Sequence, residues 1–419
     1  MICKPKLPRV AAQLSIESVQ TEVHRVLPRR WVTPWDALAH PASVFLNSAY
    51  LRALDEGSEA IACYHVVFTQ QKTVVGIAAF QRVTVEQGSG EPAEQGQSVI
   101  RQVARKIMTH GHERVQVLVL GNSFATGEHA FAFDQRVATA DQIKLVTEAA
   151  ASIRKIAEET GEKIQGTLIK DFFEGPFSSE KPFKTARYAS VASSPNNLMP
   201  VLAEWRNFDD YLHALISKYR TKAKAALRRA EDLEIRALNR TEITAHAAQL
   251  HQLYLNVRAR ADFKLGELGT NALPLFAEYM PNDFALYGYF FKGQLVGFQT
   301  TFRNGKCLDA HFVGINYDLN ASLGIYPRML YHFIELAIAG DFDRINFGRT
   351  ATEIKSTVGA FPVQMYSYLR HSSSTSNTLL RWFSSVLSPE VEPAHAAFKV
   401  TEIKKMVQSE RYSFVASAL

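Results

Sequence analysis

The sequence predicts a mixed α/β protein built from two similar units that follow one another along the chain. In each half, short strand patterns around a polar turn precede another strand, and amphipathic helices lie between the strands. The segment "FTQQKTVVGIAAF" in the first half also resembles "FFKGQLVGFQTTF" in the second, because each has a Val-Gly pair within the returning strand. Such a match is typical of an internal duplication.

The length and composition indicate a folded protein with more than one core. A chain of 419 residues exceeds the size at which a single core stops growing, and 47% apolar with 21% charged residues is typical of globular proteins. The net charge of +6 favours an anionic partner, which leaves phosphate, coenzyme, nucleic acid and lipid headgroups open. Cys3, Cys63 and Cys307 match no metal or redox spacing, so we expect no metal site and a reducing cytoplasm. Without a signal peptide or a run of about 18 apolar residues, membrane contact would be peripheral, on the inner face.

The first half begins after an N-terminal arm, residues 1–39. A helix is predicted at 43–57, a hairpin at 63–83, a polar surface loop at 85–98, a buried strand at 115–122, an amphipathic helix at 140–161 and a further strand at 163–172. These elements define a first lobe at residues 40–195.

The second half repeats this plan over residues 196–371. Helices are predicted at 205–233 and 246–260, a three-stranded meander at 284–315, a helix at 325–340 and a strand at 344–348. The meander turns at Lys292-Gly293 and Asn304-Gly305. Residues 372–419 remain as an amphipathic C-terminal tail.

This order of elements, with "EIKSTVGAFPVQMYSY" after the last short strand, resembles the GNAT acyltransferase superfamily. Its duplication in one chain is similar to the FemAB-like branch of predicted N-acyltransferases, in which a Gly-containing strand end is followed by a Lys and a small-residue turn. The matching positions here are Phe347-Gly348, Lys355 and Val358-Gly359-Ala360. The resemblance covers roughly residues 40 to 371 and implies two GNAT-like lobes, with catalysis in the second.

The resemblance also implies an acyl thioester as co-substrate and no permanently bound cofactor. In the segment "NASLGIYPR", Gly324 matches the glycine of the superfamily's coenzyme fingerprint and the other fingerprint positions differ. Gly324, Ile325 and Arg328 are therefore the candidates for binding coenzyme A, with acyl carrier protein as the other possible donor. Pro327 suits a first helical turn, so this loop is expected to present amides and a positive helix end to phosphate.

Asp309 and His311 are the candidates for proton transfer. Strand alternation in "CLDAHFVGI" predicts that they share one face, with Ala310 and Phe312 on the other. His311 would be the general base and Asp309 the group that orients it, since histidine titrates near neutrality. The alternative is a hydrogen-bonded strand histidine beside an ordinary charge.

Arg349 and Lys355 follow the strand that ends at Gly348. At a strand end these cations can face a phosphate or the developing oxyanion, and Glu353 is expected to orient one of them by pairing. The resemblance likewise places a Lys near the acceptor or the oxyanion. A purely structural ion pair is the alternative.

Two segments suggest a surface partner. The helix "SKYRTKAKAALRRAEDL" carries Lys218, Lys222 and Arg229, and it is compatible with solvent, nucleic acid or acidic lipid. The tail segment "NTLLRWFSSVLSP", residues 377–389, gathers Trp382 and Phe383 with leucines, so it either docks on the protein or lies in a membrane interface.

The function predicted from the sequence is transfer of an acyl group from a thioester to a primary amine, such as an amino lipid or long-chain base. One alternative is an aminoacyl-tRNA-dependent transferase that acts on a peptidoglycan precursor, in which case tRNA is the nucleic-acid partner. The other is a non-catalytic binding module with the same fold. Donor chain length, acceptor and oligomeric state are left open by the sequence.

Overall fold

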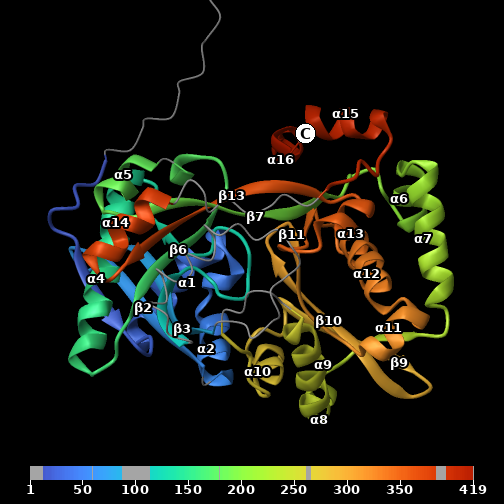
Figure 1. Ribbon diagram of the computed structural model, residues 1–419, viewed down its shortest axis with the longest axis horizontal. Coiled ribbons are helices and arrows are strands. Elements are labelled where there is room, and N and C mark those ends of the chain that lie inside the picture. The colour runs from blue at the N-terminus through green and yellow to red at the C-terminus, as the bar shows by residue number, and fades with distance from the viewer. Residues whose placement is uncertain are drawn as a thin grey trace, which may run out of the picture.

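One mixed β-sheet runs through the whole computed structural model (Figure 1). The structure describes residues 13–58, 60–86, 114–178, 180–260, 266–383 and 393–418, so the predicted loop at 85–98 lies almost entirely outside the described residues. The strands are β1 (Gln20–His24), β2 (Ile61–Gln70), β3 (Thr73–Glu86), β4 (Arg114–Leu120), β5 (Phe131–Phe133), β6 (Gly166–Phe172), β7 (Ala189–Pro200), β8 (Glu234–Ala237), β9 (Phe284–Phe291), β10 (Gln294–Asn304), β11 (Cys307–Ile315), β12 (Arg344–Asn346) and β13 (Phe361–His371). The mixed α/β prediction is confirmed.

The strand order reads as a palindrome. It is β1-β2-β3-β4-β6-β13-β7-β12-β11-β10-β9-β8, with β5 paired to β3 outside this path. Reading inward from the two ends pairs β1 with β8, β2 with β9, β3 with β10, β4 with β11 and β6 with β12. We call β1 to β6 the first lobe and β8 to β12 the second lobe. This symmetry is what a duplicated unit produces.

The two lobes exchange their last strands at the centre of the sheet. β13 follows β12 in the chain but pairs with β6, and β7 follows β6 but pairs with β12. β7 and β13 then pair with each other. The predicted boundary between residues 195 and 196 therefore falls inside β7, a strand that joins the lobes.

The repeated Val-Gly pairs have a packing role. A Cβ atom placed on Gly76 in β3 would lie 2.2 Å from the Phe133 ring, and one placed on Gly297 in β10 would lie 3.0 Å from Ile325 and Met329. Each glycine thus lets a neighbouring element approach its hairpin closely.

Helices cover both faces of the sheet. They are α1 (Arg29–Ala42), η1 (Val44–Leu46), α2 (Ser48–Gly57), α4 (Thr139–Glu159), α5 (Glu180–Thr185), α8 (Arg240–Ala245), α9 (Ala247–Ala259), α10 (Ala272–Tyr279), α11 (Tyr317–Leu323), α12 (Ile325–Ala339) and α13 (Thr352–Thr357).

The helix predicted at 205–233 is two helices, so this prediction was wrong. They are α6 (Phe208–Ala214) and α7 (Ser217–Arg229). Between them, Leu215 forms a β-bridge with Phe398, and the amide of Ile216 donates to Ala397 O. A tail segment more than 180 residues away along the chain therefore breaks the helix, and no local signal marks the break.

Most of the described tail packs on the protein. In α15 (Val400–Gln408) and α16 (Ser413–Ala418), Met406 and Val415 are buried in the second-lobe core. In α14 (Ser374–Phe383), Leu380 is buried but Trp382 is 78% exposed. The rest of the predicted interface segment, 384–389, lies outside the described residues. Within the described ranges, the structure contains no helix of the length and apolarity needed to cross a membrane.

Candidate active site between β11 and β12

The parallel strands β11 and β12 separate in the middle of the sheet. Only three residue pairs join them, and the last pair is Asp309 with Asn346. β11 continues to Ile315, whereas the chain after Asn346 turns away through Gly348, whose φ is +71°. Ligands of open α/β sheets characteristically bind where strands end in this way.

Asp309 lies at this separation point and is 3% exposed. The side-chain amide of Asn346 donates a hydrogen bond to Asp309 Oδ1 at 2.6 Å, while Oδ2 has no partner within the described part of the chain. Burial raises the pKa of Asp309 to about 7, against the smaller opposing effects of Asn304, Asn346 and Arg344. A carboxyl group with this pKa can accept a proton near neutral pH.

His311 sits in an aromatic pocket made by Phe45, Tyr50 and Phe302. Burial and the neighbouring His129 lower the pKa of His311 to about 3, so its ring is neutral at physiological pH. Neither ring nitrogen has a hydrogen-bond partner among the described residues. A neutral imidazole keeps one N–H donor, but it is a poor acceptor for a proton from an ammonium group.

The predicted alternation along β11 was wrong at Phe312. The pairing with β10 shifts between Gln299 and Thr301, which gives β11 an extra residue there. The Thr300 hydroxyl fills the gap, because it accepts from the Phe312 amide and donates to Phe312 O. The bulge turns both His311 and Phe312 into the same aromatic cluster, with ring centroids 4.2 Å apart.

Lys355 is buried in α13 and faces its own loop. Its ammonium donates to the carbonyl oxygens of Phe347 at 2.7 Å and Arg349 at 2.6 Å, with Gly348 O at 3.4 Å. Lys355 thus holds the backbone that leaves β12. The exposed Glu353, expected to orient a cation, has a carboxylate oxygen 3.7 Å from His395 Nε2.

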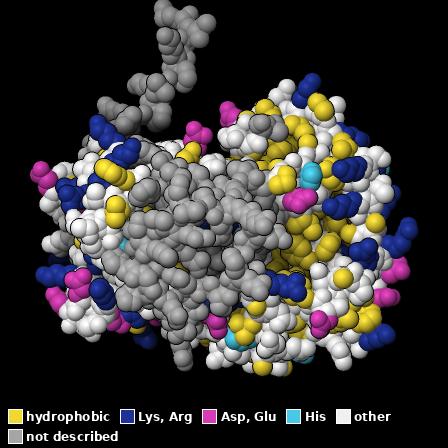
Figure 2. Space-filling model, viewed as in Figure 1, with side chains coloured by type: hydrophobic (Ala, Val, Ile, Leu, Met, Phe, Trp, Pro, Cys, Tyr) yellow, Lys and Arg dark blue, Asp and Glu magenta, His cyan; other side chains and the backbone are white. Residues whose placement is uncertain are grey.

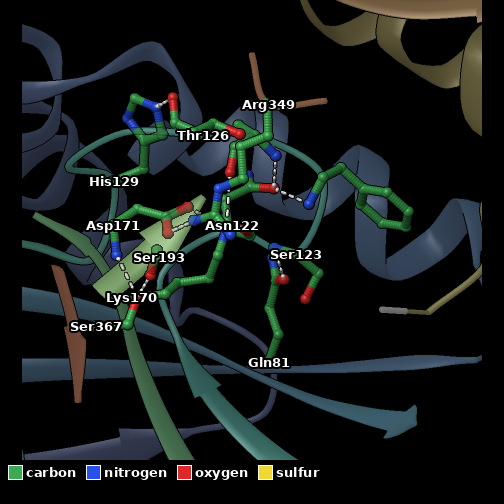
Figure 3. Close-up of polar contacts among 12 residues, drawn as sticks. Gln81, Asn122, Ser123, Thr126, His129, Lys170, Asp171, Ser193, Arg349 and Ser367 are labelled. Atoms are coloured by element: carbon green, nitrogen blue, oxygen red, sulfur yellow. Dashed lines mark hydrogen bonds and ion pairs between the residues drawn. The ribbon is translucent and has the colours of Figure 1, made fainter. Parts of the chain in front are cut away.

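Arg349 forms an ion pair with Asp171 of β6, so it joins the two lobes (Figure 3). Asp171 also pairs with Lys170 at 2.6 Å, and Lys170 donates to Asn122 O at 2.6 Å and to Ala125 O at 2.9 Å. Burial lowers the pKa of Arg349 to about 10. The sequence analysis did not identify Lys170 and Asp171 as site residues. Their position was the available signal, because they lie at the end of a buried strand and Arg349 also follows a strand end.

A first-lobe loop, residues 121–129, connects these groups. In this loop, the carbonyl oxygen of Ala125 accepts a hydrogen bond from the Lys170 ammonium. The next carbonyl oxygen, that of Thr126, accepts from the side-chain amide of Asn346 at 2.9 Å. The same loop holds His129, whose Nδ1 lies 2.7 Å from the Ser43 hydroxyl. Two adjacent carbonyl groups therefore place the Asp309 site and the Arg349 cluster side by side.

Gly324, with φ of +59°, joins α11 to α12. The expected phosphate loop is already hydrogen-bonded: Gly324 N donates to Asn320 O, Tyr326 N to Asn320 Oδ1 and Arg328 N to Gly324 O. Pro327 has no N–H, and Ile325 is fully buried. This helix start therefore presents few amides to a ligand.

Arg328 does not point toward that helix start. Its guanidinium pairs with Glu335 at 2.9 Å, two turns further along α12. The cation that lies against Gly324 is Arg229 of α7, whose Cδ would be 3.1 Å from a Cβ at position 324. The printed partners of Gly324 and Arg328 thus lie in α11, α12 and α7, whereas Asp309, Arg349 and Lys355 have partners in β12, in the loop after β12 and in the first lobe.

The family model of the acetyltransferase (GNAT) domain matches residues 217–356, the part of the chain that contains β11, α12 and β12. These residues form a GNAT-type acetyltransferase domain. The match favours an enzyme over the non-catalytic binding module that the sequence left open.

Among solved structures, the fold of this chain is similar to that of FemX, and two further proteins align over most of its length. FemX is 10% identical with a TM-score of 0.51, covering 86% of this chain and 100% of FemX. A tandem GNAT protein from the clavulanic acid biosynthesis pathway is 9% identical with a TM-score of 0.48, over 85% of this chain and 99% of that one. The C-terminal domain of a putative lysylphosphatidylglycerol synthetase from Agrobacterium fabrum is 11% identical with a TM-score of 0.48, over 84% and 95%. No curated protein matches the chain.

Proposed function

We propose that the acyltransferase moves an acyl group from a thioester to a primary amine at the separation of β11 and β12, with Asp309 as general base. The observation that carries this proposal is the state of Asp309: a buried carboxyl group with a pKa of about 7, one oxygen fixed by Asn346 and the other without a partner among the described residues. This assignment replaces His311 as the base, because the pKa of His311 is about 3.

In the proposed reaction, Asp309 Oδ2 removes a proton from the substrate ammonium. The amine nitrogen then attacks the thioester carbon, and the N–C bond forms as the carbonyl oxygen gains negative charge. The neutral His311 ring offers an N–H donor to that oxyanion. When the intermediate collapses, the C–S bond breaks, and the amine nitrogen gives up its second proton to the leaving thiolate. Asp309 then releases its own proton to solvent.

An apolar strip beside this site suits the acyl donor. Where β11 runs on without β12, apolar side chains on this face of the second lobe are only partly buried, and Figure 2 shows apolar side chains gathered there, bordered by Lys and Arg. Partly buried apolar residues on β11, α11, α12 and α13 include Ala310, Val313, Tyr317, Tyr326 and Ile354. A thioester arm or acyl chain would remove this surface from water, at about 25 cal/mol per Å².

A second candidate is an aminoacyl-tRNA-dependent transferase. It is favoured by the hydrogen-bonded start of α12, which leaves few amides for a coenzyme diphosphate at Gly324. Along α7, Lys218, Lys222 and Arg229 are exposed and form a basic surface for a phosphate backbone. In this case the donor would be an ester of tRNA, and Asp309 would keep its role.

An amino lipid or long-chain base is our proposed acceptor for the thioester-dependent reaction. Support comes from α14, where Trp382 and Leu379 are exposed on the surface while Leu380 anchors the helix. Exposed aromatic and aliphatic side chains of this kind bind membrane interfaces. Such contact would bring the acyltransferase to a membrane-embedded amine.

Ligand-induced stabilisation separates the donors. The melting temperature of the purified chain would be followed with coenzyme A, acetyl-coenzyme A, long-chain acyl-coenzyme A and charged tRNA, because a ligand of the native state raises its apparent stability. A shift that grows with acyl length, followed by thiol release when an amine is added, supports the thioester reaction. A shift with charged tRNA alone supports the second candidate, and no transfer from any donor contradicts both.

A further inference from the structure

The strand separation in the first lobe is filled by a cation. β4 and β6 pair last at Leu120 and Ile169, as β11 and β12 do at Asp309 and Asn346. Two residues later the chain takes a positive φ in both lobes, +73° at Asp171 and +71° at Gly348. In the first lobe the side chain of Lys170 occupies the gap.

Lys170 fits this gap tightly and is hydrogen-bonded to it. A Cβ atom on Gly121 would lie 3.0 Å from Lys170 Cγ, and the ammonium binds two carbonyl oxygens of the loop after β4. In the first lobe, Lys170 therefore lies at the place equivalent to the candidate site of the second lobe. It contributes positive charge to the junction of the lobes.

The junction holds two cations and one carboxylate. Asp171 is fully buried between Lys170 and Arg349, and it pairs with both. Two nearby carboxylates have other hydrogen-bond partners. Glu128 accepts from the amide of Phe173, and Asp309 accepts from the side-chain amide of Asn346. Burial lowers the pKa of His129 and of Lys170, and the neighbouring cations Lys170 and Arg349, respectively, lower them further. Within this cluster, one carboxylate therefore faces two cationic side chains.

Arg349 is the most exposed member of this cluster. Its side chain is 25% exposed, whereas the side chains of Lys170 and Asp171 are 5% and 0% exposed. Its Nε is buried and has no acceptor within the described residues. A guanidinium offers a planar pair of donors that matches a carboxylate or phosphate.

We infer that the Arg349–Asp171–Lys170 cluster binds an oxyanion, a carboxylate or phosphate, carried by the acceptor amine. The acceptor would lie across the lobe junction, with its amine at Asp309 and its anionic group at Arg349. The position of the amine in this inference rests on the proposed acyl transfer, whereas the position of the anion rests on the cluster alone. Among the proposed acceptors it favours an amino lipid that carries a phosphate over a long-chain base, which has no anionic group. Amino acids, peptides with a free carboxylate and phosphorylated amino alcohols also meet this requirement.

Matched pairs of amines test this inference. Initial rates would be measured with phenylalanine against phenethylamine, lysine against cadaverine, and phosphoethanolamine against ethanolamine. We expect kcat/KM to favour the anionic member by about tenfold to 100-fold, the strength of one charge-assisted contact. Arg349→Gln should reduce that ratio toward one, mainly through KM, and Arg303→Gln, an exposed arginine on β10, should leave it unchanged. A ratio that Arg349→Gln does not alter overturns the inference.

A binding measurement keeps the anion site separate from the acyl transfer. Thermal stabilisation by succinate, inorganic phosphate and pyrophosphate would be compared for the wild type, Arg349→Gln and Arg349→Lys. Stabilisation that is seen for the wild type and lost in Arg349→Gln supports the anion site even when no amine is acylated. Arg349→Lys is included because it keeps the positive charge and can be measured if Arg349→Gln does not fold. Equal stabilisation of the wild type and the variants, or none at all, overturns it. A phosphate-only response that acyl-coenzyme A abolishes assigns the anion to the donor and also overturns the inference.

Discussion

Asn346 of β12 donates a hydrogen bond of 2.6 Å to Asp309 of β11, across the last residue pair before the two strands separate. The same amide also donates to Thr126 O of the first lobe at 2.9 Å. One side chain therefore fixes the candidate base, the end of β12 and the loop of the other lobe. The position of Asp309 depends on all three segments.

Asp309→Asn should abolish the pH dependence of acyl transfer. Because the pKa of Asp309 is about 7, the wild-type rate should rise as the pH increases through 7 and the carboxylate forms. The amide cannot take the proton, so kcat should fall by about 10²-fold to 10⁴-fold. The pH profile of thiol release measures both effects.

Two variants serve as controls for this prediction. Asp232→Asn changes an exposed carboxylate and should leave the profile as it is. His311→Gln should lower kcat but keep the midpoint near pH 7, because the pKa of His311 is too low to produce that transition. A midpoint that moves in His311→Gln and persists in Asp309→Asn would restore His311 as the base.

Asp309 should also make folding stability depend on pH. Its pKa is raised from 3.8 to about 7 on folding, so the folded state takes up a proton between these values. Below about pH 4, Asp309 does not reduce the free energy of unfolding. As the pH rises through 7, the reduction grows to at most about 4 kcal/mol. Asp309→Asn should therefore gain stability relative to the wild type at pH 8 but not at pH 4. Urea unfolding at the two pH values measures this difference, and parallel behaviour would contradict it.

Lys355→Met should disorder the loop after β12. The substitution keeps most of the side-chain length but leaves the carbonyl groups of Phe347 and Arg349 without their buried donor. Each such group costs about 1–3 kcal/mol, so the free energy of unfolding should fall by at least about 2 kcal/mol. Activity should fall with it, since Arg349 lies in this loop. Full turnover with an unchanged denaturation curve would exclude the positioning role.

Gly324→Ala tests whether the start of α12 binds the coenzyme. With φ of +59°, alanine at this position should cost about 1–2 kcal/mol of stability. If the amides there are already used within the protein, stabilisation by acetyl-coenzyme A should be the same for variant and wild type. A selective loss of that stabilisation would place the diphosphate at Gly324.

Trp382→Ser addresses the acceptor. Trp382 is exposed, so the melting temperature should not change, whereas Leu380→Ser should lower it by removing a buried anchor of α14. We expect Trp382→Ser to weaken binding to vesicles that contain anionic lipid and to slow acylation of a vesicle-embedded amine. Unchanged vesicle binding would remove the support for a lipid acceptor.

The sequence by itself determined the element types and the duplication. Strand alternation, turn residues and helical periodicity are local properties, so the two hairpins, the meander and α12 could be predicted, and the Val-Gly pairs gave the repeat. It also placed Asp309, His311, Arg349 and Lys355 near one strand end, because they lie close together along β11 and after β12.

Only the tertiary structure decided what those residues face. The bulge at His311 depends on Thr300 of the neighbouring strand, the break after α6 depends on Phe398, and the partner of Arg349 is Asp171 in the other lobe. Our proposal of Asp309 rather than His311 as the base rests on burial, which raises the pKa of an acid and lowers that of histidine. Burial is set by segments distant in the chain, and a local sequence pattern does not contain it.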